Sequence, residues 1–463
     1  MDLLRPDPEP LNRRAFLKRA GFGLGVAALA GLDPTSPAIR PRAKRVIWLC
    51  MAGGPSQFET FDPKPKLAAM DGELMPDSFT KGQPIAQLQG QQLRCLGPQF
   101  RFGRHGESGL EIADILPFTA RIADRICVIR SMQTDQINHD PAHTVMNTGT
   151  SISGRPSMGA WVNYGLGSES SDLPGFVVLT SVGGRNPQPI ASRQWSAGFL
   201  PGRLQGVEFQ SHGDPVHYVR NPAGVARDQQ RAVIDATVAL DRELAAPGRD
   251  PELDTRIAQY ELAFRMQAAV PELMDVSSES AETLAMYGTT GNDGSFAANC
   301  LLARRLAERG VRFIQLYHRG WDHHGDLVKY MRVCGRLCDQ PAAALVTDLA
   351  RRGMLDDTLV VWGGEFGRTP MFQGKGQEAG RDHHIRGFTM WVAGAGVRGG
   401  SAYGATDELG YFAVENPVHV RDLHATMLYL LGLDHRSLSV RYQGLDMRLT
   451  GVEPARVLHD ILT

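Results

Sequence analysis

The stretch LVTDLARRGMLDDTLVVWGGEFG, residues 345–367, decides the fold. It begins with an amphipathic helical pattern, turns at Gly353 and continues as the apolar run TLVVW, which two glycines end. An apolar run without alternation is typical of a parallel strand that is buried on both faces. A helix that leads directly into such a strand predicts one repeat of an α/β fold.

The same kind of apolar run occurs elsewhere along the chain, at residues 45–51, 125–132, 175–181, 311–317 and 388–394. Helical patterns separate several of these runs. The alternation predicts an α/β three-layer sandwich, with a mostly parallel sheet and helices on both faces. In such sheets ligands bind beyond the carboxyl ends of the strands, so that edge is where we expect the functional site.

The composition is that of one large globular domain. The chain has 463 residues, 42% of them hydrophobic and 21% charged, with a formal net charge of -1. We expect a single domain over residues 44–463, with a charged helical insertion around 227–287. Because the net charge is close to zero, nothing global indicates nucleic acid as a partner, and we expect none.

The N-terminus has the pattern of a targeting segment. NRRAFLK, residues 12–18, places Arg13 and Arg14 before a short apolar run at 20–32. We interpret residues 1–33 as a twin-arginine signal and 34–43 as a linker, although a basic amphipathic helix of the mature protein is the alternative. This interpretation predicts the twin-arginine export machinery as a partner and a periplasmic or extracytoplasmic location. An uncleaved leader would anchor the chain to the membrane.

Histidines and carboxylates gather where the predicted strands end. They follow the strands at 125–132, 311–317 and 357–364 or precede the strand at 388–394, as Asn138, His139, His143, Asp322, His324, Glu365, Asp382, His383 and His384. Imidazoles and carboxylates that meet at one edge form a plausible metal or acid–base site. By contrast, Cys334 and Cys338 lie one helical turn apart with no second pair, which favours buried apolar thiols.

Two local patterns assign these residues more closely. In HDPAH, residues 139–143, Pro141 suits a first helical turn, which puts His139 at a helix N-terminus where its imidazole should stay neutral. Solvated histidines beside a capping Asn138 or Asp140 are the alternative. In GWDHHGD, residues 320–326, strand-like alternation favours His324 beside Asp322, against an alternative of an incidental Gly-rich surface turn. In GRDHH we prefer His383 to His384.

The order of these motifs resembles the alkaline phosphatase and sulfatase superfamily. Residues 345–367 are similar to its helix and TLVVxTxDHG strand, and HDPAHTVMNTG (139–149) to the sulfatase signature that leads into Thr-Gly. The combination of leader, GGPSQFETFDPKP, GRPSMGAWVNYGLG, GEFGRTP and GRDHH resembles more closely a family of exported bacterial proteins known as domain of unknown function 1501.

The resemblance implies a changed site. Gly53 and Gly54 stand where the superfamily has a metal-binding Asp, His139 stands at the nucleophile, and Glu365-Phe366 replaces an Asp-His pair. Asp322 and His383 resemble ligands of the other metal, which His324 would complete. Ser56 follows the first strand and could contact substrate, with a role in the turn as the alternative. Glu59 or Asp62 could replace the missing Asp.

Two functions follow from this resemblance. The first is a hydrolase of a phosphate or sulfate ester, on a small molecule or a glycan, that depends on a divalent metal such as zinc, calcium or manganese. In it His139 and His143 are catalytic, and Asp322, His324, Glu365 and His383 bind the metal. The alternative is a non-catalytic descendant that binds an anionic glycan or a protein partner.

Overall fold

A computed structural model describes residues 39–217, 219–221, 223–244, 251–374 and 378–463. The proposed leader at 1–33 and residues 34–38 of the linker lie outside the described residues. Within them, no helix has both the length and the apolar character needed to cross a membrane.

The centre of the described chain is a nine-stranded sheet with the order β12-β4-β11-β8-β1-β7-β5-β6, in which β15 also pairs with β4. Its strands are β1 (Arg45–Ala52), β4 (Ile126–Gln133), β5 (Phe176–Arg185), β6 (Val207–Phe209), β7 (Phe313–Trp321), β8 (Thr358–Gly363), β11 (Phe388–Ala393), β12 (Ser401–Tyr403) and β15 (Val418–His419). All six strands expected from apolar runs are present, which confirms those predictions.

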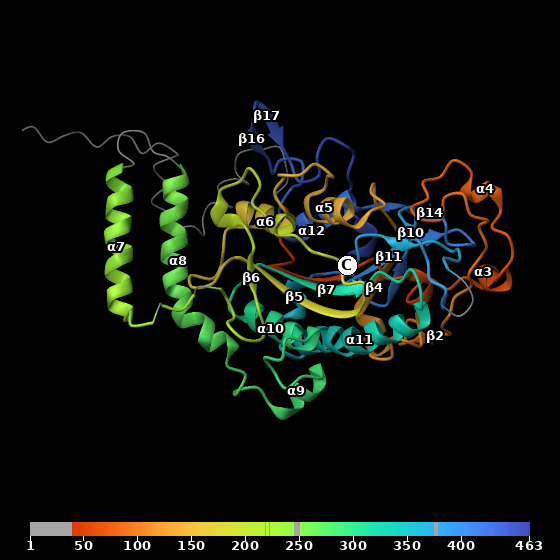
Figure 1. Cartoon of the computed structure of the whole chain (residues 1–463), viewed down its shortest axis with the longest axis horizontal. Coiled ribbons are helices and arrows are strands. Elements are labelled where there is room, and N and C mark those ends of the chain that lie inside the picture. The colour runs from red at the N-terminus through yellow and green to blue at the C-terminus, as the bar shows by residue number, and fades with distance from the viewer. Residues whose placement is uncertain (1–38, 218, 222, 245–250, 375–377) are drawn as a thin grey trace, which may run out of the picture.

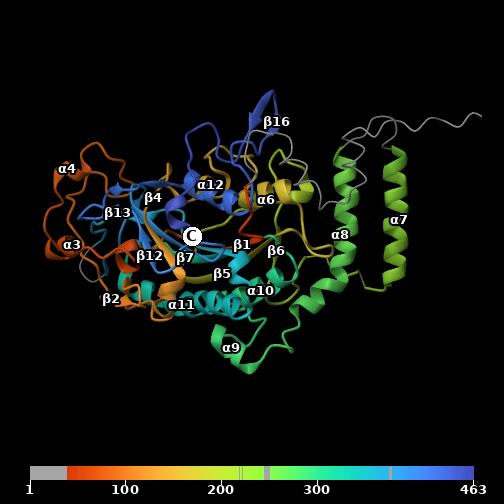
Figure 2. The same ribbon diagram turned by 180° about the vertical axis from the view of Figure 1, so that it is seen from behind.

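Helices cover both faces of the sheet, as Figures 1 and 2 show. One layer contains α10 (Phe296–Glu308) and α11 (Leu327–Arg351), and the other contains α5 (His139–Thr148), α6 (Met158–Leu166) and α12 (Val420–Leu430). Alternate β1 residues enter the two cores, since Leu49 packs with the first layer and Trp48 with the second. The expected three-layer α/β sandwich is therefore confirmed.

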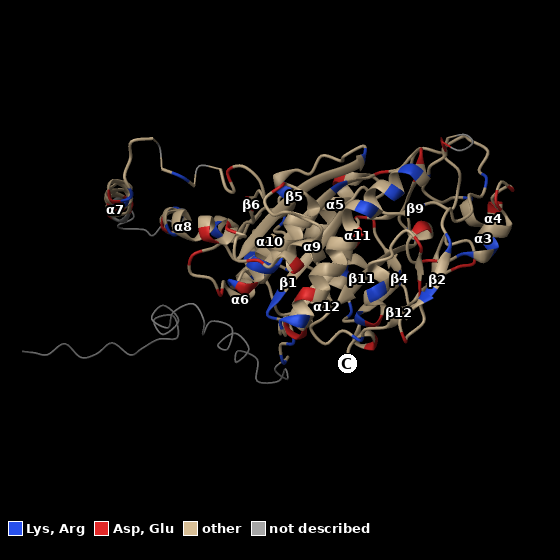
Figure 3. Ribbon diagram, turned by 90° about the horizontal axis from the view of Figure 1, so that it is seen from below, with Lys and Arg blue, Asp and Glu red and all other residues tan. Residues whose placement is uncertain are grey.

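The region around 227–287 is helical, as expected. It contains α7 (Arg227–Leu244), α8 (Pro251–Met274) and α9 (Ala281–Tyr287), and α8 continues through Pro271. The remaining short elements are α3 (Pro65–Ala69), α4 (Asp77–Thr80), β2 (Phe102–His105), β3 (Leu110–Ala113), β9 (Gly367–Arg368), β10 (His383–His384), β13 (Ala405–Thr406), β14 (Ala413–Glu415), β16 (Val440–Tyr442) and β17 (Leu445–Met447). Figure 3 shows basic and acidic positions interspersed over the described chain.

The direction of β11 explains how a late histidine reaches the site. β11 pairs antiparallel with both β4 and β8, whereas β1 pairs parallel with β7 and β8. The residues that precede β11 therefore lie at the same edge as the residues that follow β4, β7 and β8. This edge brings together His139, Asp322, Glu365 and His383 from four distant parts of the sequence.

A buried ion pair stabilises the loops at this edge of the sheet. Arg381, two residues before His383, donates to both carboxylate oxygens of Glu59 at 3.0 and 2.8 Å, and both side chains are fully buried. Its guanidinium also donates to the carbonyls of Leu96 and Gly97. Because Glu59 is committed to this pair, it does not replace the missing Asp of the superfamily. Asp62 does not either, since it pairs with Lys64 at 2.8 Å.

We predict that Glu59→Ala lowers the free energy of unfolding by about 3–5 kcal/mol, because it leaves the Arg381 charge buried without a partner. Denaturant unfolding of the purified chain measures this change. The control is Glu408→Ala, which removes the exposed pair with Lys66 and should cost less than about 1 kcal/mol. Equal effects of the two substitutions would contradict the supporting role of the buried pair.

Candidate metal centre

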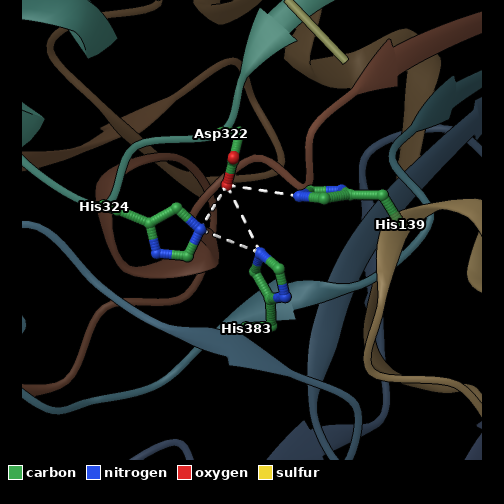
Figure 4. Close-up of side chains that lie close together, drawn as sticks. All are labelled: His139, Asp322, His324 and His383. Carbon is green, nitrogen blue, oxygen red and sulfur yellow. Dashed lines mark hydrogen bonds and ion pairs between the residues drawn. The ribbon is translucent and has the colours of Figure 1, made fainter. Parts of the chain in front are cut away.

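Four side chains converge on one point at the carboxyl edge of the sheet. They are His139, Asp322, His324 and His383, and their candidate ligand atoms all lie within 4.8 Å of one another. The Nε2 atoms of His139, His324 and His383 lie 3.3, 2.8 and 3.3 Å from Asp322 Oδ1. Figure 4 shows the three imidazoles turned toward this carboxylate.

These side chains come from different elements of the fold. His139 is the first residue of α5, Asp322 directly follows β7, and His383 begins β10. Gly53 allows the end of β1 to approach Asp322, since its φ is +120° and a Cβ there would lie 2.5 Å from the Asp322 nitrogen. The close approach therefore depends on glycine at this position.

The Nδ1 atom of each of these three imidazoles contacts an oxygen that can only accept a hydrogen bond. His139 Nδ1–H donates to Glu365 Oε1 at 2.6 Å, His324 Nδ1–H to Gln373 Oε1 at 2.5 Å, and His383 Nδ1–H to the Ile137 carbonyl at 2.8 Å. A proton on Nδ1 leaves a lone pair on Nε2 of a neutral imidazole. Partners of this kind orient histidines that bind metals.

The neutral tautomers fit a cation between the rings. With Nδ1 protonated in both, the Nε2 atoms of His324 and His383 face each other at 3.0 Å, lone pair against lone pair. His139 Nε2 is buried and lies 3.3 Å from Asp322 Oδ1. A divalent metal about 2.0–2.1 Å from each nitrogen would satisfy all three lone pairs.

Asp322 is held as the anionic member of the group. Arg368 donates to Asp322 Oδ1 at 2.7 Å, and Gln188 donates to Oδ2 at 2.8 Å. Burial alone would raise the pKa of Asp322, but Arg368 and the three imidazoles hold that pKa well below its usual range. The carboxylate therefore stays ionised, which is the form that binds a metal.

Glu365 lies behind His139 and is completely buried. The Gly53 N–H donates to both of its oxygens, at 3.0 and 3.1 Å. Burial raises the pKa of Glu365, but His143 and His139 outweigh that effect and lower it to about 2. Glu365 thus forms a second group with His139 and His143, and we interpret it as the partner that orients His139.

The structure corrects the expected direction of the His139 pKa shift, so a metal that binds Nε2 would displace a proton from this ring. We expected a neutral imidazole because of the helix N-terminus. Burial does lower its pKa, but hydrogen bonds to Asp322 and Glu365 outweigh burial and raise the pKa above its ordinary value. The Asp322 and Glu365 carboxylates therefore determine the direction of the shift. Both lie far from His139 in the sequence, so the local helix pattern could not predict their effect.

The other predicted site residues lie around this centre. His143 is buried, with Nε2 3.4 Å from Glu365 Oε1, so a catalytic role for it stays a prediction and would act through Glu365. Asn138 occupies the N-cap position without a side-chain capping bond. Asp382 accepts from the Gln87 and Leu88 N–H groups, and His384 Nε2 contacts the Tyr411 carbonyl.

Ser56 does not join the group. Its hydroxyl donates to the buried Glu59 carboxylate, which also binds Arg381. Ser56 is only 1% exposed, so contact of its hydroxyl with a substrate stays a prediction that these contacts do not support. The sequence analysis also missed Arg368, Gln188 and Gln373. Only Arg368 had a signal, since it stands in the GEFGRTP motif.

The centre is partly open on one side. The side chains of His139 and His324 are 14% and 17% exposed, whereas those of Asp322 and His383 are 7% and 5% exposed. Parts of the His139 and His324 side chains therefore reach solvent, although His139 Nε2 itself is buried. A ligand in addition to the four side chains would enter from there.

Fold and site together define a three-layer α/β protein with an imidazole-rich candidate metal centre. The chain belongs to the family described as protein of unknown function (DUF1501), whose model matches residues 43–462. No curated protein matches the sequence.

Several solved structures are similar over most of the chain. PsFucS1 sulfatase from Pseudoalteromonas sp. is 12% identical, with 89% of this chain and 71% of that chain covered and a TM-score of 0.34. A protein in the alkaline phosphatase superfamily from Vibrio parahaemolyticus is 11% identical, with 89% and 74% covered and a TM-score of 0.33. The lipoteichoic acid synthase LtaP from Listeria monocytogenes is 10% identical, with 93% and 80% covered and a TM-score of 0.34.

We predict that Asp322→Ala and His139→Ala each lose the bound metal of the purified chain, because each removes one of four converging ligands. Elemental analysis after gel filtration measures the metal per chain. The control is His459→Ala, which removes an exposed histidine outside the group. Unchanged stoichiometry in both ligand variants would contradict the site.

We also predict that Glu365→Gln weakens metal affinity by about 10–100-fold while the fold is retained, because the neutral amide holds His139 less firmly. Competition with a chromophoric chelator measures the affinity. Glu415→Gln makes the same chemical change on an exposed strand residue and should leave the affinity unchanged. Equal affinities of the two variants would count against the orienting role of Glu365.

Proposed function

We propose that this chain is a hydrolase of phosphate or sulfate esters that depends on one divalent metal. The observation that carries the proposal is the convergence of three Nε2 lone pairs and the Asp322 carboxylate on one point. Such a metal supplies Lewis acidity and lowers the pKa of a water molecule bound to it.

The donor set selects among the expected metals. Three imidazoles and one carboxylate suit zinc and other transition ions, whereas calcium prefers oxygen ligands alone. We therefore favour zinc over manganese and place calcium last.

The residues of the chain support a water nucleophile. The superfamily's nucleophile position holds His139, whose Nε2 points into the metal group. Ser56 is bound to Glu59, and all six cysteines are buried. Arg368 and Gln188 fix the two Asp322 oxygens, so the carboxylate keeps one orientation during the reaction. The exposed edges of His139 and His324 mark the side from which an ester would approach.

A second candidate function is favoured by the number of ligands. Four protein side chains fill a tetrahedral shell, which is typical of structural zinc sites, whereas catalytic sites usually keep one position open. A chain with a closed site would bind an anionic glycan or a protein partner without turnover. We rank this candidate below hydrolysis because two of the four side chains, His139 and His324, are partly exposed.

The test is a screen of nitrophenyl phosphate, phosphonate and sulfate esters with the zinc-loaded chain. We predict turnover that a chelator abolishes, that added zinc restores, and that Asp322→Ala reduces to background. The His459→Ala variant should keep full activity. Stoichiometric zinc without turnover of any ester, combined with tight binding of a sulfated or phosphorylated polymer, would favour the second candidate instead.

A further inference from the structure

The helix α7 lies at the far end of the molecule. Figures 1 and 2 show α8 between α7 and the body of the protein, and Figure 3 shows the same order from below. α7 packs against α8 through the buried side chains of Ile234 and Val238, and Arg231 binds Glu261 at 2.8 Å. The opposite face of α7 is turned away from the rest of the described chain.

That outer face is apolar where a solvated helix face is normally polar. Val233 and Leu240 are 58% and 57% exposed, and Ala232, Ala236 and Ala239 are exposed as well. At 100° per residue these five positions form one stripe opposite Ile234 and Val238. A helix that is apolar on two opposite faces is normally covered on both.

The five residues of this stripe are arranged symmetrically about Ala236, so two copies of the stripe can pair with each other. When a second copy of α7 lies antiparallel with Ala236 at the twofold axis, Val233 meets Ala239 and Leu240 meets Ala232. Each large side chain thus faces a small one, which lets two helices approach closely. A parallel pairing would instead set Val233 against Val233 and Leu240 against Leu240.

The polar ends of the stripe agree with the antiparallel arrangement. Gln229 and Glu243 are exposed at its two ends, and the same twofold axis brings Gln229 of one copy to Glu243 of the other. The Gln229 carbonyl oxygen accepts from the Ala226 N–H, so its amide group is free to donate to that carboxylate. A parallel pairing would place the two Glu243 carboxylates together.

The flanks of the stripe argue against a lipid surface. Asp228 and Asp235 are exposed beside it, whereas helices that lie on anionic membranes carry Lys and Arg there. We propose that the outer face of α7 docks on the same face of a second copy of this chain, as an antiparallel twofold dimer. The two hairpins of α7 and α8 then form a four-helix layer between two catalytic bodies, with self-complementary contacts of the kind that twofold dimers use.

The test compares two identical substitutions in the purified full-length chain. Ala236→Glu places two like charges at the twofold axis and should weaken dimerisation by about 100-fold or more. Ala263→Glu introduces the same charge at an exposed position of α8 and should leave the dimer intact. Sedimentation equilibrium gives both dissociation constants, and thermal melting checks that both variants are folded.

A cross-link gives a positive readout. Ala236→Cys should form a covalent dimer on mild oxidation, whereas Ala263→Cys should not, and the native cysteines do not compete because all six are buried. A monomeric wild-type chain at micromolar concentration, or a dimer that Ala236→Glu leaves unchanged, would overturn the proposal. Neither result depends on metal or on turnover, so the outcome is separate from that of the proposed hydrolase.

Discussion

The central constraint in this protein is the set of three hydrogen bonds that hold protons on the Nδ1 atoms of His139, His324 and His383. These bonds turn every Nε2 lone pair toward the Asp322 carboxylate. Without them the rings could rotate or exchange tautomers, and the group would be an ordinary collection of polar side chains. A buried set of facing lone pairs is costly unless a cation lies between them, so the geometry itself points to a metal.

The topology of the sheet brings these four side chains to one edge. Strands β4, β7 and β8 all end at one edge, and the single reversed strand β11 begins there. Loops from four separate regions therefore meet over a rigid platform, and packing on both faces of the sheet fixes the platform. The buried pair of Glu59 and Arg381 ties the loop before β11 to the first strand's turn. The packed core and the buried ion pair thus fix the positions of the site residues.

Much of this architecture could be predicted from the sequence, because runs of apolar residues indicate buried strands. The strand ends also identified His139, Asp322, His324 and His383, since residue type and position after a strand are both local properties. What could not be predicted depends on contacts between distant segments. Gln373 and the Ile137 carbonyl orient two of the imidazoles, yet neither carries a charge or a motif that would mark it.

The division of the six expected site residues into two groups is a second example of this limit. The sequence placed Glu365 with the metal ligands, but in the structure its carboxylate accepts from the Gly53 N–H behind His139. Glycine at position 53 suggests a missing ligand when the sequence is considered alone, whereas in the fold its buried N–H donates to the Glu365 carboxylate.

The most direct measurement is anomalous diffraction at the zinc edge from crystals of the metal-loaded chain. The account predicts one peak about 2 Å from His139 Nε2, His324 Nε2, His383 Nε2 and Asp322 Oδ1. A peak between Glu365 and His143, or no peak in crystals of the loaded protein, would contradict it.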